Sequence, residues 1–189
     1  MNKKVCVIGL GHIGFPIMCI LANSGYSVLG VDIDEKVVSK INAVNYMIHE
    51  TALKDLFIKG ICKKNLKIST KVEHSDIYII AVHTPLNLEN KPDISYVSAA
   101  IESIISYLET DNLILIESTC PIGTTEMMAK RLRIVCSNIF IAYCPERILP
   151  GNILSELIYN DRIVGGIDNQ SGTQAADFYR SFIYLFSIN

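Results

Sequence analysis

Three glycines near the amino terminus have the spacing of a phosphate-binding turn. Positions 9, 11 and 14 form a Gly-x-Gly-x-x-Gly motif directly after the apolar run 5–8, and residues 15–24 carry apolar side chains at helical spacing. The backbone N–H groups at the start of such a helix can hold a pyrophosphate. A strand before the motif and a helix after it make the pattern far more specific than the glycines alone. The residues expected to bind a dinucleotide in this turn are Gly9, Gly11, His12, Ile13 and Gly14.

An acidic residue follows at the distance that this motif requires. Asp32 lies at the end of a second apolar run, residues 28–33, about 20 positions after the glycines. Its carboxylate can accept hydrogen bonds from the ribose hydroxyls of an adenosine, and its charge would repel a 2′-phosphate, so NAD is favoured over NADP. Asp34 is a competing candidate, but Asp34 and Glu35 are more typical of a helix N-cap and first turn.

Polar residues also follow three later apolar runs. Thr84, Thr119 and Glu146 each come a few positions after a run of strand length. In an open α/β sheet, ligands bind just beyond the carboxyl ends of the strands, so these side chains are candidates for one shared site. For Thr84 taken alone, a plain turn at the end of a strand explains the position equally well. The three runs are residues 77–82, 112–116 and 139–143.

The elements that must position these residues alternate between strand and helix along the whole chain. This alternation predicts an α/β fold: a Rossmann-like, doubly wound, mainly parallel sheet with helices on both faces. Besides the runs already named, strands are expected at 66–69 and 162–166. Further helices are expected at 35–41, 51–58, 94–108 and 170–182, with one more that begins at an N-cap on Thr124 or Thr125.

Composition limits the class of protein. The chain has 189 residues, of which 50% are hydrophobic and 19% charged, as expected for one globular domain or one domain and a fragment. A net charge of -2 gives no electrostatic reason to expect nucleic acid or an anionic membrane as a partner. The start Met-Asn-Lys-Lys does not resemble a signal peptide, and no apolar run reaches membrane-spanning length, so a cytoplasmic location is expected.

The six cysteines show no spacing typical of a metal site, and no metal is expected. Four of them, Cys6, Cys19, Cys136 and Cys144, lie in or beside apolar runs, where a thiol behaves as a small hydrophobic side chain.

Four segments taken together resemble the nucleotide-sugar 6-dehydrogenases, the family that includes UDP-glucose dehydrogenase and the UDP-N-acetylhexosamine dehydrogenases. They are residues 9–16, Thr84-Pro85, residues 117–125 and residues 143–147, and the resemblance runs in order from Lys4 to about Phe182.

Residues 145–152 and 160–166 are most similar to the UDP-N-acetyl-D-mannosamine branch. Pro150 stands where UDP-glucose dehydrogenases usually carry a second acidic residue. The N-acetylglucosamine branch is the next candidate and the glucose branch the third.

The resemblance implies an NAD-dependent, two-step oxidation of the C6 hydroxymethyl group of a UDP-sugar to a carboxylate, through a cysteine thiohemiacetal and thioester. It implies that Thr84 and Thr119 line the nicotinamide side, and that Thr119 and Glu146 are catalytic residues near the reacting carbon. Glu146, Arg147 and Arg162 are the implied substrate-binding residues. For both arginines, pairing with a carboxylate at the edge of the core is at least as good an explanation.

The resemblance also implies a division of the chain. Residues 1–182 correspond to the NAD-binding domain, whereas residues 183–189 do not resemble the family. The family's catalytic cysteine, lysine and asparagine belong to a central helix and a UDP-sugar-binding domain beyond this sequence. We therefore expect the cofactor half of such an enzyme, inactive alone, and the pattern fits a truncated or frameshifted reading frame. The alternatives to a part of an enzyme are a non-catalytic nucleotide-binding module and a decayed remnant. A homodimer is expected for the full-length family.

Overall fold

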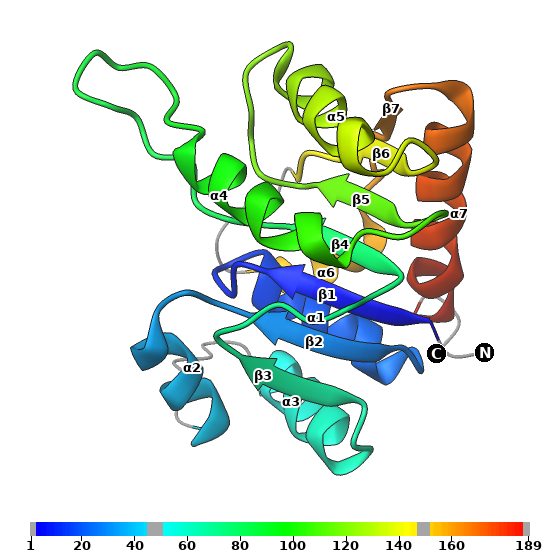
Figure 1. Cartoon of the computed structure of the whole chain (residues 1–189). Helices are drawn as coiled ribbons and strands as arrows, with labels where there is room; N and C mark the ends of the chain where they lie inside the picture. Colours follow the sequence, from blue (N-terminus) through cyan, green and yellow to red (C-terminus); the bar gives the residue numbers. More distant parts are fainter. Residues whose placement is uncertain (1–2, 45–50, 147–151, 187–189) are drawn as a thin grey trace.

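The structure, a computed structural model, describes residues 3–44, 51–146 and 152–186. Its centre is one seven-stranded sheet (Figure 1). The strands are β1 (Lys4–Ile8), β2 (Ser27–Val31), β3 (Leu66–Ser69), β4 (Ile77–Ile80), β5 (Leu113–Ile116), β6 (Phe140–Tyr143) and β7 (Gly165–Gly166). Their spatial order is β3-β2-β1-β4-β5-β6-β7, and every neighbouring pair is parallel except β6 and β7. This confirms the predicted doubly wound sheet.

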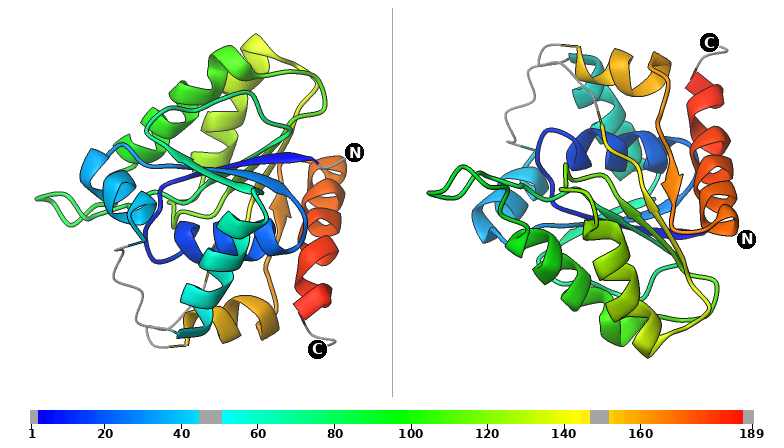
Figure 2. Two further views of the ribbon diagram at one scale, coloured as in Figure 1. Left: turned by 90° about the horizontal axis from the view of Figure 1, so that it is seen from below. Right: turned by 90° about the horizontal axis from the view of Figure 1, so that it is seen from above.

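Helices cover both faces of the sheet (Figure 2). They are α1 (Gly14–Asn23), α2 (Glu35–Asn42), α3 (Thr51–Cys62), α4 (Ser95–Ile104) with a 3-10 turn η1 (Ile105–Tyr107), α5 (Thr124–Val135), α6 (Ile153–Tyr159) and α7 (Asn169–Phe186). Helices α1, α3, α6 and α7 share one apolar core with the sheet, and α4 and α5 share the other. Alternate side chains of β1 enter the two cores: Val5 and Val7 face α1, whereas Cys6 and Ile8 face the layer of α4 and α5.

The order of the strands determines where a ligand can bind. The chain moves outward from β1 to β2 and β3, then returns to the other side of β1 as β4 and continues outward. At the carboxyl ends of β1 and β4 the connections therefore diverge, and this divergence leaves a crevice between them. The glycine turn after β1 opens into this crevice.

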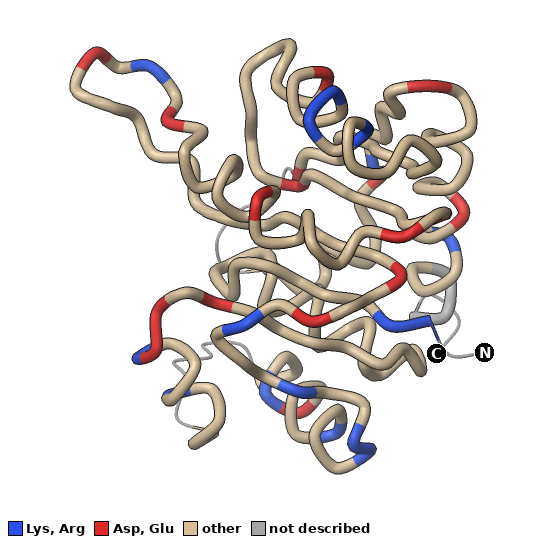
Figure 3. The backbone as a smooth tube through the Cα atoms, in the orientation of Figure 1, with Lys and Arg blue, Asp and Glu red and all other residues tan. Residues whose placement is uncertain are grey.

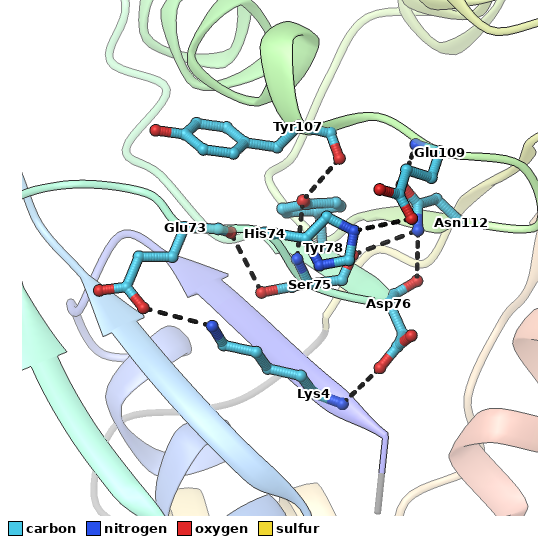
Figure 4. A network of polar contacts seen from close by, with 9 residues as sticks. All are labelled: Lys4, Glu73, His74, Ser75, Asp76, Tyr78, Tyr107, Glu109 and Asn112. Carbon is cyan, nitrogen blue, oxygen red and sulfur yellow. Dashed lines mark hydrogen bonds and ion pairs between the residues drawn. The ribbon is translucent and has the colours of Figure 1, made fainter.

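A polar network lies at the amino ends of β4 and β5, on the side of the sheet away from the glycine turn (Figure 4). The buried Tyr78 hydroxyl accepts a hydrogen bond from the Ser75 N–H at 3.0 Å and donates to the Tyr107 carbonyl at 3.4 Å. The Asn112 side chain accepts from the Glu109 N–H at 2.8 Å and donates to the Ser75 carbonyl at 3.2 Å. These contacts satisfy buried backbone groups at the amino ends of β4 and β5, so this edge is structural.

Several predicted boundaries were wrong. Helix α5 begins after Gly123, whose φ is 89°, and neither Thr124 nor Thr125 is its N-cap. The last strand contains only Gly165–Gly166, so Arg162 lies before it in a loop. Helix α3 continues to Cys62, α7 continues to Phe186, and α6 was not expected at all. The short α6 escaped notice because seven residues carry too little periodicity to be distinguished from a loop.

Burial of three cysteines confirms their interpretation as small hydrophobic residues. Cys6, Cys19 and Cys144 are almost fully buried, and burial raises the pKa of the Cys6 thiol to about 12. Cys136 is only partly buried.

Both signs of charge occur on both helical layers (Figure 3). None of the helices in the described part of the chain has the length and apolar composition needed to span a membrane.

Candidate functional site

The glycine turn after β1 is held by close backbone contacts. The Gly9 N–H donates to the Val31 carbonyl at 2.8 Å, which joins the ends of β1 and β2. Gly9 has a φ of 94°, and a Cβ at this position would lie 2.5 Å from the Ala81 carbonyl oxygen. A Cβ at Gly14 would lie 1.8 Å from the Gly9 carbonyl oxygen. Only glycine fits at either position without displacing backbone.

Gly11 is open where the other two glycines are crowded. A Cβ added there meets no protein atom within 4 Å, and its φ is not in the left-handed region. Nothing in the protein therefore requires glycine at this position, and a ligand that approaches the backbone closely would. Helix α1, which begins three residues later, has no side chain bonded to its N-cap. In the first turn, however, the Phe15 N–H already donates to the Gly11 carbonyl at 3.2 Å and Pro16 has no N–H, so an anion at this helix start would depend mainly on the N–H groups of the preceding turn.

Asp32 lies beside this turn and has a structural role as well. Its carboxylate accepts the Leu10 N–H at 2.9 Å with one oxygen and the Asp34 N–H at 3.0 Å with the other. Asp34 in turn accepts the Lys36 N–H at 2.8 Å as the N-cap of α2, which confirms the role predicted for it. Asp32, and not Asp34, borders the groove described next.

A groove of about 540 Å³ runs from the glycine turn along the carboxyl ends of β2, β3 and β4. We call it the large groove. Gly9, Gly11 and Asp32 form one wall. The opposite wall is one face of α4 and η1, with Tyr96 and Tyr107. An apolar groove with a carboxylate at one end suits an adenosine, whose base is flat and whose ribose offers two hydroxyls.

A smaller cavity of about 140 Å³, the small cavity, continues beyond the glycine turn. It shares Ala81, Val82 and His83 with the large groove, so the two form one continuous surface. The ends of β4, β5 and β6 converge on it. Four residues that the sequence predicted for the site line it together, namely Ile13, Thr84, Thr119 and Glu146.

A cluster of buried charged side chains, two of which line the small cavity, was not predicted from the sequence. The Glu117 side chain, fully buried directly after β5, lies 3.4 Å from Arg162 Nη1 and accepts a hydrogen bond from the Tyr179 hydroxyl. Arg162 Nη2 lies 2.8 Å from a Glu146 carboxylate oxygen, and its guanidinium stacks 4.5 Å from the centre of the Tyr179 ring. We call Glu117, Glu146, Arg162 and Tyr179 the buried charge cluster.

Burial shifts the pKa values of ionisable groups in and beside this cluster. Burial raises the pKa of Glu117 to about 7, although Arg162 and the Tyr179 hydroxyl oppose part of that shift. Burial likewise raises the pKa of the neighbouring Cys144 thiol to about 12 and that of Cys120 to about 11. The cysteines nearest the small cavity are therefore neutral thiols near pH 7 and poor nucleophiles.

The positions of the remaining predicted residues can now be given. His12 and Thr119 are exposed beside the ligand surfaces, and Arg147 lies outside the described residues. Arg162 is 8% exposed and pairs with two carboxylates, which is the alternative that the sequence left open for it. Within the described ranges, no group of three His, Cys, Asp or Glu side chains could hold a metal ion.

Glu117 and Tyr179 belong to the site but were not predicted from the sequence. Glu117 had a usable signal, because a carboxylate directly after a fully apolar strand must be buried or must face a ligand. Tyr179 had none, since it is one of several aromatic residues on the apolar face of α7.

The fold and this two-part surface define a Rossmann-type dinucleotide-binding domain. A model of the UDP-glucose/GDP-mannose dehydrogenase family, NAD binding domain, matches residues 3–183. The UDP-N-acetyl-D-mannosamine dehydrogenase of Methanocaldococcus jannaschii is 46% identical over 186 residues, which cover 97% of this chain and 43% of that protein. The UDP-N-acetyl-D-mannosamine dehydrogenase of Campylobacter jejuni is 40% identical in an alignment of 198 positions that covers 97% of this chain and 49% of that protein.

Solved structures agree with these sequence matches. The UDP-D-ManNAc dehydrogenase of Pyrococcus horikoshii superposes with a TM-score of 0.90 at 37% identity, over 95% of this chain and 44% of that one. The UDP-N-acetyl-mannosamine dehydrogenase of Staphylococcus aureus gives a TM-score of 0.88 at 37% identity, over 95% and 45%. This chain belongs to the UDP-glucose/GDP-mannose dehydrogenase family and corresponds to its NAD-binding domain. It spans less than half the length of these relatives.

Proposed function

We propose that this chain is the cofactor-binding part of an NAD-dependent enzyme that oxidises the C6 hydroxymethyl group of UDP-N-acetyl-D-mannosamine to a carboxylate. NAD is the cofactor of the matched domain, and the substrate is the one named for the relatives at 46% and 40% identity. The observation that supports the cofactor site best is the contrast among the three glycines, because Gly11 alone is left open toward the groove. UDP-N-acetylglucosamine and UDP-glucose are the second and third candidate substrates.

In this proposal the large groove takes the adenosine half of NAD. Asp32 receives the ribose hydroxyls, and the turn at residues 9–14 receives the pyrophosphate on the N–H groups of its second half, which includes His12 and Ile13, because the Gly9 and Leu10 N–H groups already bond to Val31 and Asp32. When bound, NAD supplies the hydride acceptor. Thr84 and Thr119 then lie on the nicotinamide side, at the small cavity.

Glu146 is proposed to act near the reacting carbon together with Thr119, where it orients water or substrate hydroxyls. Its ion pair with Arg162 supports this role, because a fixed guanidinium holds the carboxylate in one orientation at the wall of the small cavity. Arg162 accordingly positions Glu146, and direct contact of Arg162 with the sugar stays a prediction, as does that of Arg147. The neutral thiols of Cys120 and Cys144 favour a nucleophile from outside the described residues.

A pair of aspartate variants tests the cofactor site. We expect Asp32→Asn to weaken NAD binding about tenfold or more, because hydrogen bonds to a charged group are worth about 1.5–3 kcal/mol. Asp34→Asn is the matched control, since asparagine is an equally good N-cap and Asp34 does not border the groove. Calorimetric titration of the folded proteins measures both. Equal affinities for the two variants would contradict the assignment of the ribose to Asp32.

Turnover tests the other half of the proposal. We expect the 189-residue chain to produce no NADH from UDP-N-acetyl-D-mannosamine, UDP-N-acetylglucosamine or UDP-glucose. Oxidation of any of these sugars by the purified chain would show that the described residues suffice for catalysis. A homodimer and a cytoplasmic location also stay predictions, which sedimentation and cell fractionation would check.

A further inference from the structure

The buried charge cluster stands beside the part of the surface that the reactive end of the cofactor must occupy. The large groove has the length and the carboxylate for an adenosine, and the pyrophosphate cradle lies at its inner end. In the proposed NAD site, the remaining half of the dinucleotide would extend past Ile13 into the small cavity, which Ile13 lines. Glu117 and Glu146 both line that cavity, and both are at least nine-tenths buried.

The charge of this cluster is not balanced by its own members. With both carboxylates ionised, Glu117, Glu146 and Arg162 sum to one negative charge, and with Glu117 protonated they sum to zero. The nicotinamide ring carries one positive charge in oxidised NAD and none after it has accepted a hydride. An ionised Glu117 therefore complements the oxidised ring, and a protonated Glu117 complements the reduced ring. Because the site is buried, water screens this interaction weakly.

We propose that Glu117 is the residue through which this site distinguishes oxidised from reduced cofactor, by binding the positively charged nicotinamide ring preferentially when its carboxylate is ionised. The inference rests on the proposed NAD site and goes beyond it, since it assigns to Glu117 a control over which oxidation state remains bound. In this arrangement, removal of the positive charge on reduction is accompanied by uptake of a proton on Glu117.

The groups that face Glu117 set the pH range of this effect. They are Arg162 from the loop before β7, Glu146 and Cys144 from the segment after β6, and Tyr179 from α7; His83 lines the same cavity from the end of β4. Burial raises the pKa of Glu117 to about 7, with Arg162 and the Tyr179 hydroxyl lowering it in part and Glu146 raising it. A positive ring nearby lowers this pKa. Oxidised NAD must then bind more tightly above pH 7 than below it, whereas NADH gains nothing from the ionisation.

The test is a titration of NAD and NADH into the 189-residue chain at pH 6 and pH 8. If the oxidised ring lowers the pKa of Glu117 by about one unit, the ratio of NAD to NADH affinity rises about fivefold between these pH values. In Glu117→Gln the ratio should be independent of pH. His12, in the turn beside the pyrophosphate, acts on both cofactors alike, so it cancels in the ratio. His83 lines the small cavity but is unchanged in Glu117→Gln, so a pH dependence that came from it would persist in that variant and contradict the proposal. The matched control is Glu109→Gln, at the opposite edge of the sheet (Figure 4), which should keep the wild-type ratio at both pH values.

The outcomes separate the two proposals. If both cofactors bind and the wild-type ratio does not change with pH, or if Glu117→Gln keeps the wild-type dependence, the role of Glu117 is overturned while the NAD site stands. If neither cofactor binds to the folded chain, both fall. Should Glu117→Gln not fold, calorimetry of the wild type in two buffers of different ionisation enthalpy decides. NAD binding at pH 6.5 should release about half a proton more than NADH binding, and an equal release would overturn the proposal.

Discussion

Gly9, Gly11 and Gly14 belong to one motif but satisfy three different physical requirements. Gly9 has a left-handed φ and lies against the backbone of Ala81, directly after β4, and Gly14 packs against the Gly9 carbonyl. Gly11 meets neither condition, and we propose that the close approach of a ligand is the reason for glycine there. On this proposal the motif combines two residues needed for folding with one needed for binding, and alanine substitutions should distinguish the two roles.

Alanine at two of these glycines makes the distinction measurable. We expect Gly11→Ala to fold with its unfolding free energy within about 1 kcal/mol of wild type, because alanine fits this backbone, and to lose most NAD affinity. Gly14→Ala should lower the unfolding free energy by about 3 kcal/mol or more, since its Cβ would overlap the Gly9 carbonyl oxygen. Urea unfolding and calorimetric titration give the two quantities. Normal NAD binding by Gly11→Ala would contradict the proposed pyrophosphate site at the glycine turn.

At the scale of elements, the structure shows how the ends of strands become a site. Polar residues after β4, β5 and β6 converge because parallel strands place their carboxyl ends at one edge. Helix α5 starts immediately after one of these segments, and its start differs from the expected form. Gly123 turns the chain with a φ of 89°, and no side chain bonds to this N-cap position. Backbone conformation, and not threonine capping, begins this helix.

The left-handed backbone of Gly123 at the start of α5 predicts the effects of three substitutions. Gly123→Ala should cost about 1–2 kcal/mol of unfolding free energy, since a Cβ there has open space and only the left-handed backbone penalises it. Gly123→Asn should cost less, because asparagine tolerates this conformation better. Thr125→Ala, at one of the two residues expected as the N-cap, should change stability by less than about 0.5 kcal/mol. Thermal unfolding compares the three; a larger loss for Thr125→Ala than for Gly123→Ala would refute this account.

At the scale of the whole molecule, the buried charge cluster links segments that are far apart in the chain. Glu117 bonds to residues 45 and 62 positions later, so the end of β5, the loop before β7 and helix α7 depend on one another. A buried carboxylate with its pKa raised to about 7 also makes the stability of the fold depend on pH. The folded state binds the proton more tightly than the unfolded chain, so deprotonation opposes folding.

The sign and range of this dependence follow from the two pKa values. The contribution is complete below the ordinary glutamate value of 4.5 and is lost as pH rises to about 7. Unfolding free energy should therefore fall by roughly 2–3 kcal/mol between pH 5 and pH 8 through this group. Glu117→Gln should remove that decrease, whereas Glu109→Gln should keep it. Urea denaturation at both pH values measures the difference, and an identical decrease in wild type and Glu117→Gln would rule the group out.

The sequence alone determined the features that depend on short distances along the chain. The glycine turn, the acidic residue after the second strand and the alternation of apolar runs with helical segments are local patterns, so they predicted the doubly wound sheet and the NAD site. Helix starts were less accurate where backbone conformation replaced a side-chain cap, as at Gly123. Arg162 could be read in two ways, and nothing near it in sequence decided between them.

Only the tertiary structure joined Glu117, Glu146, Arg162 and Tyr179. No local pattern joins these residues to one another, and burial of the Glu117 carboxylate, which raises its pKa to about 7, exists only in the packed fold. Those partners come from a neighbouring strand end, a loop and the last described helix, which the sheet brings together at its carboxyl edge. Local patterns specify the elements and the phosphate cradle, whereas desolvation and charge pairing exist only after the elements have packed.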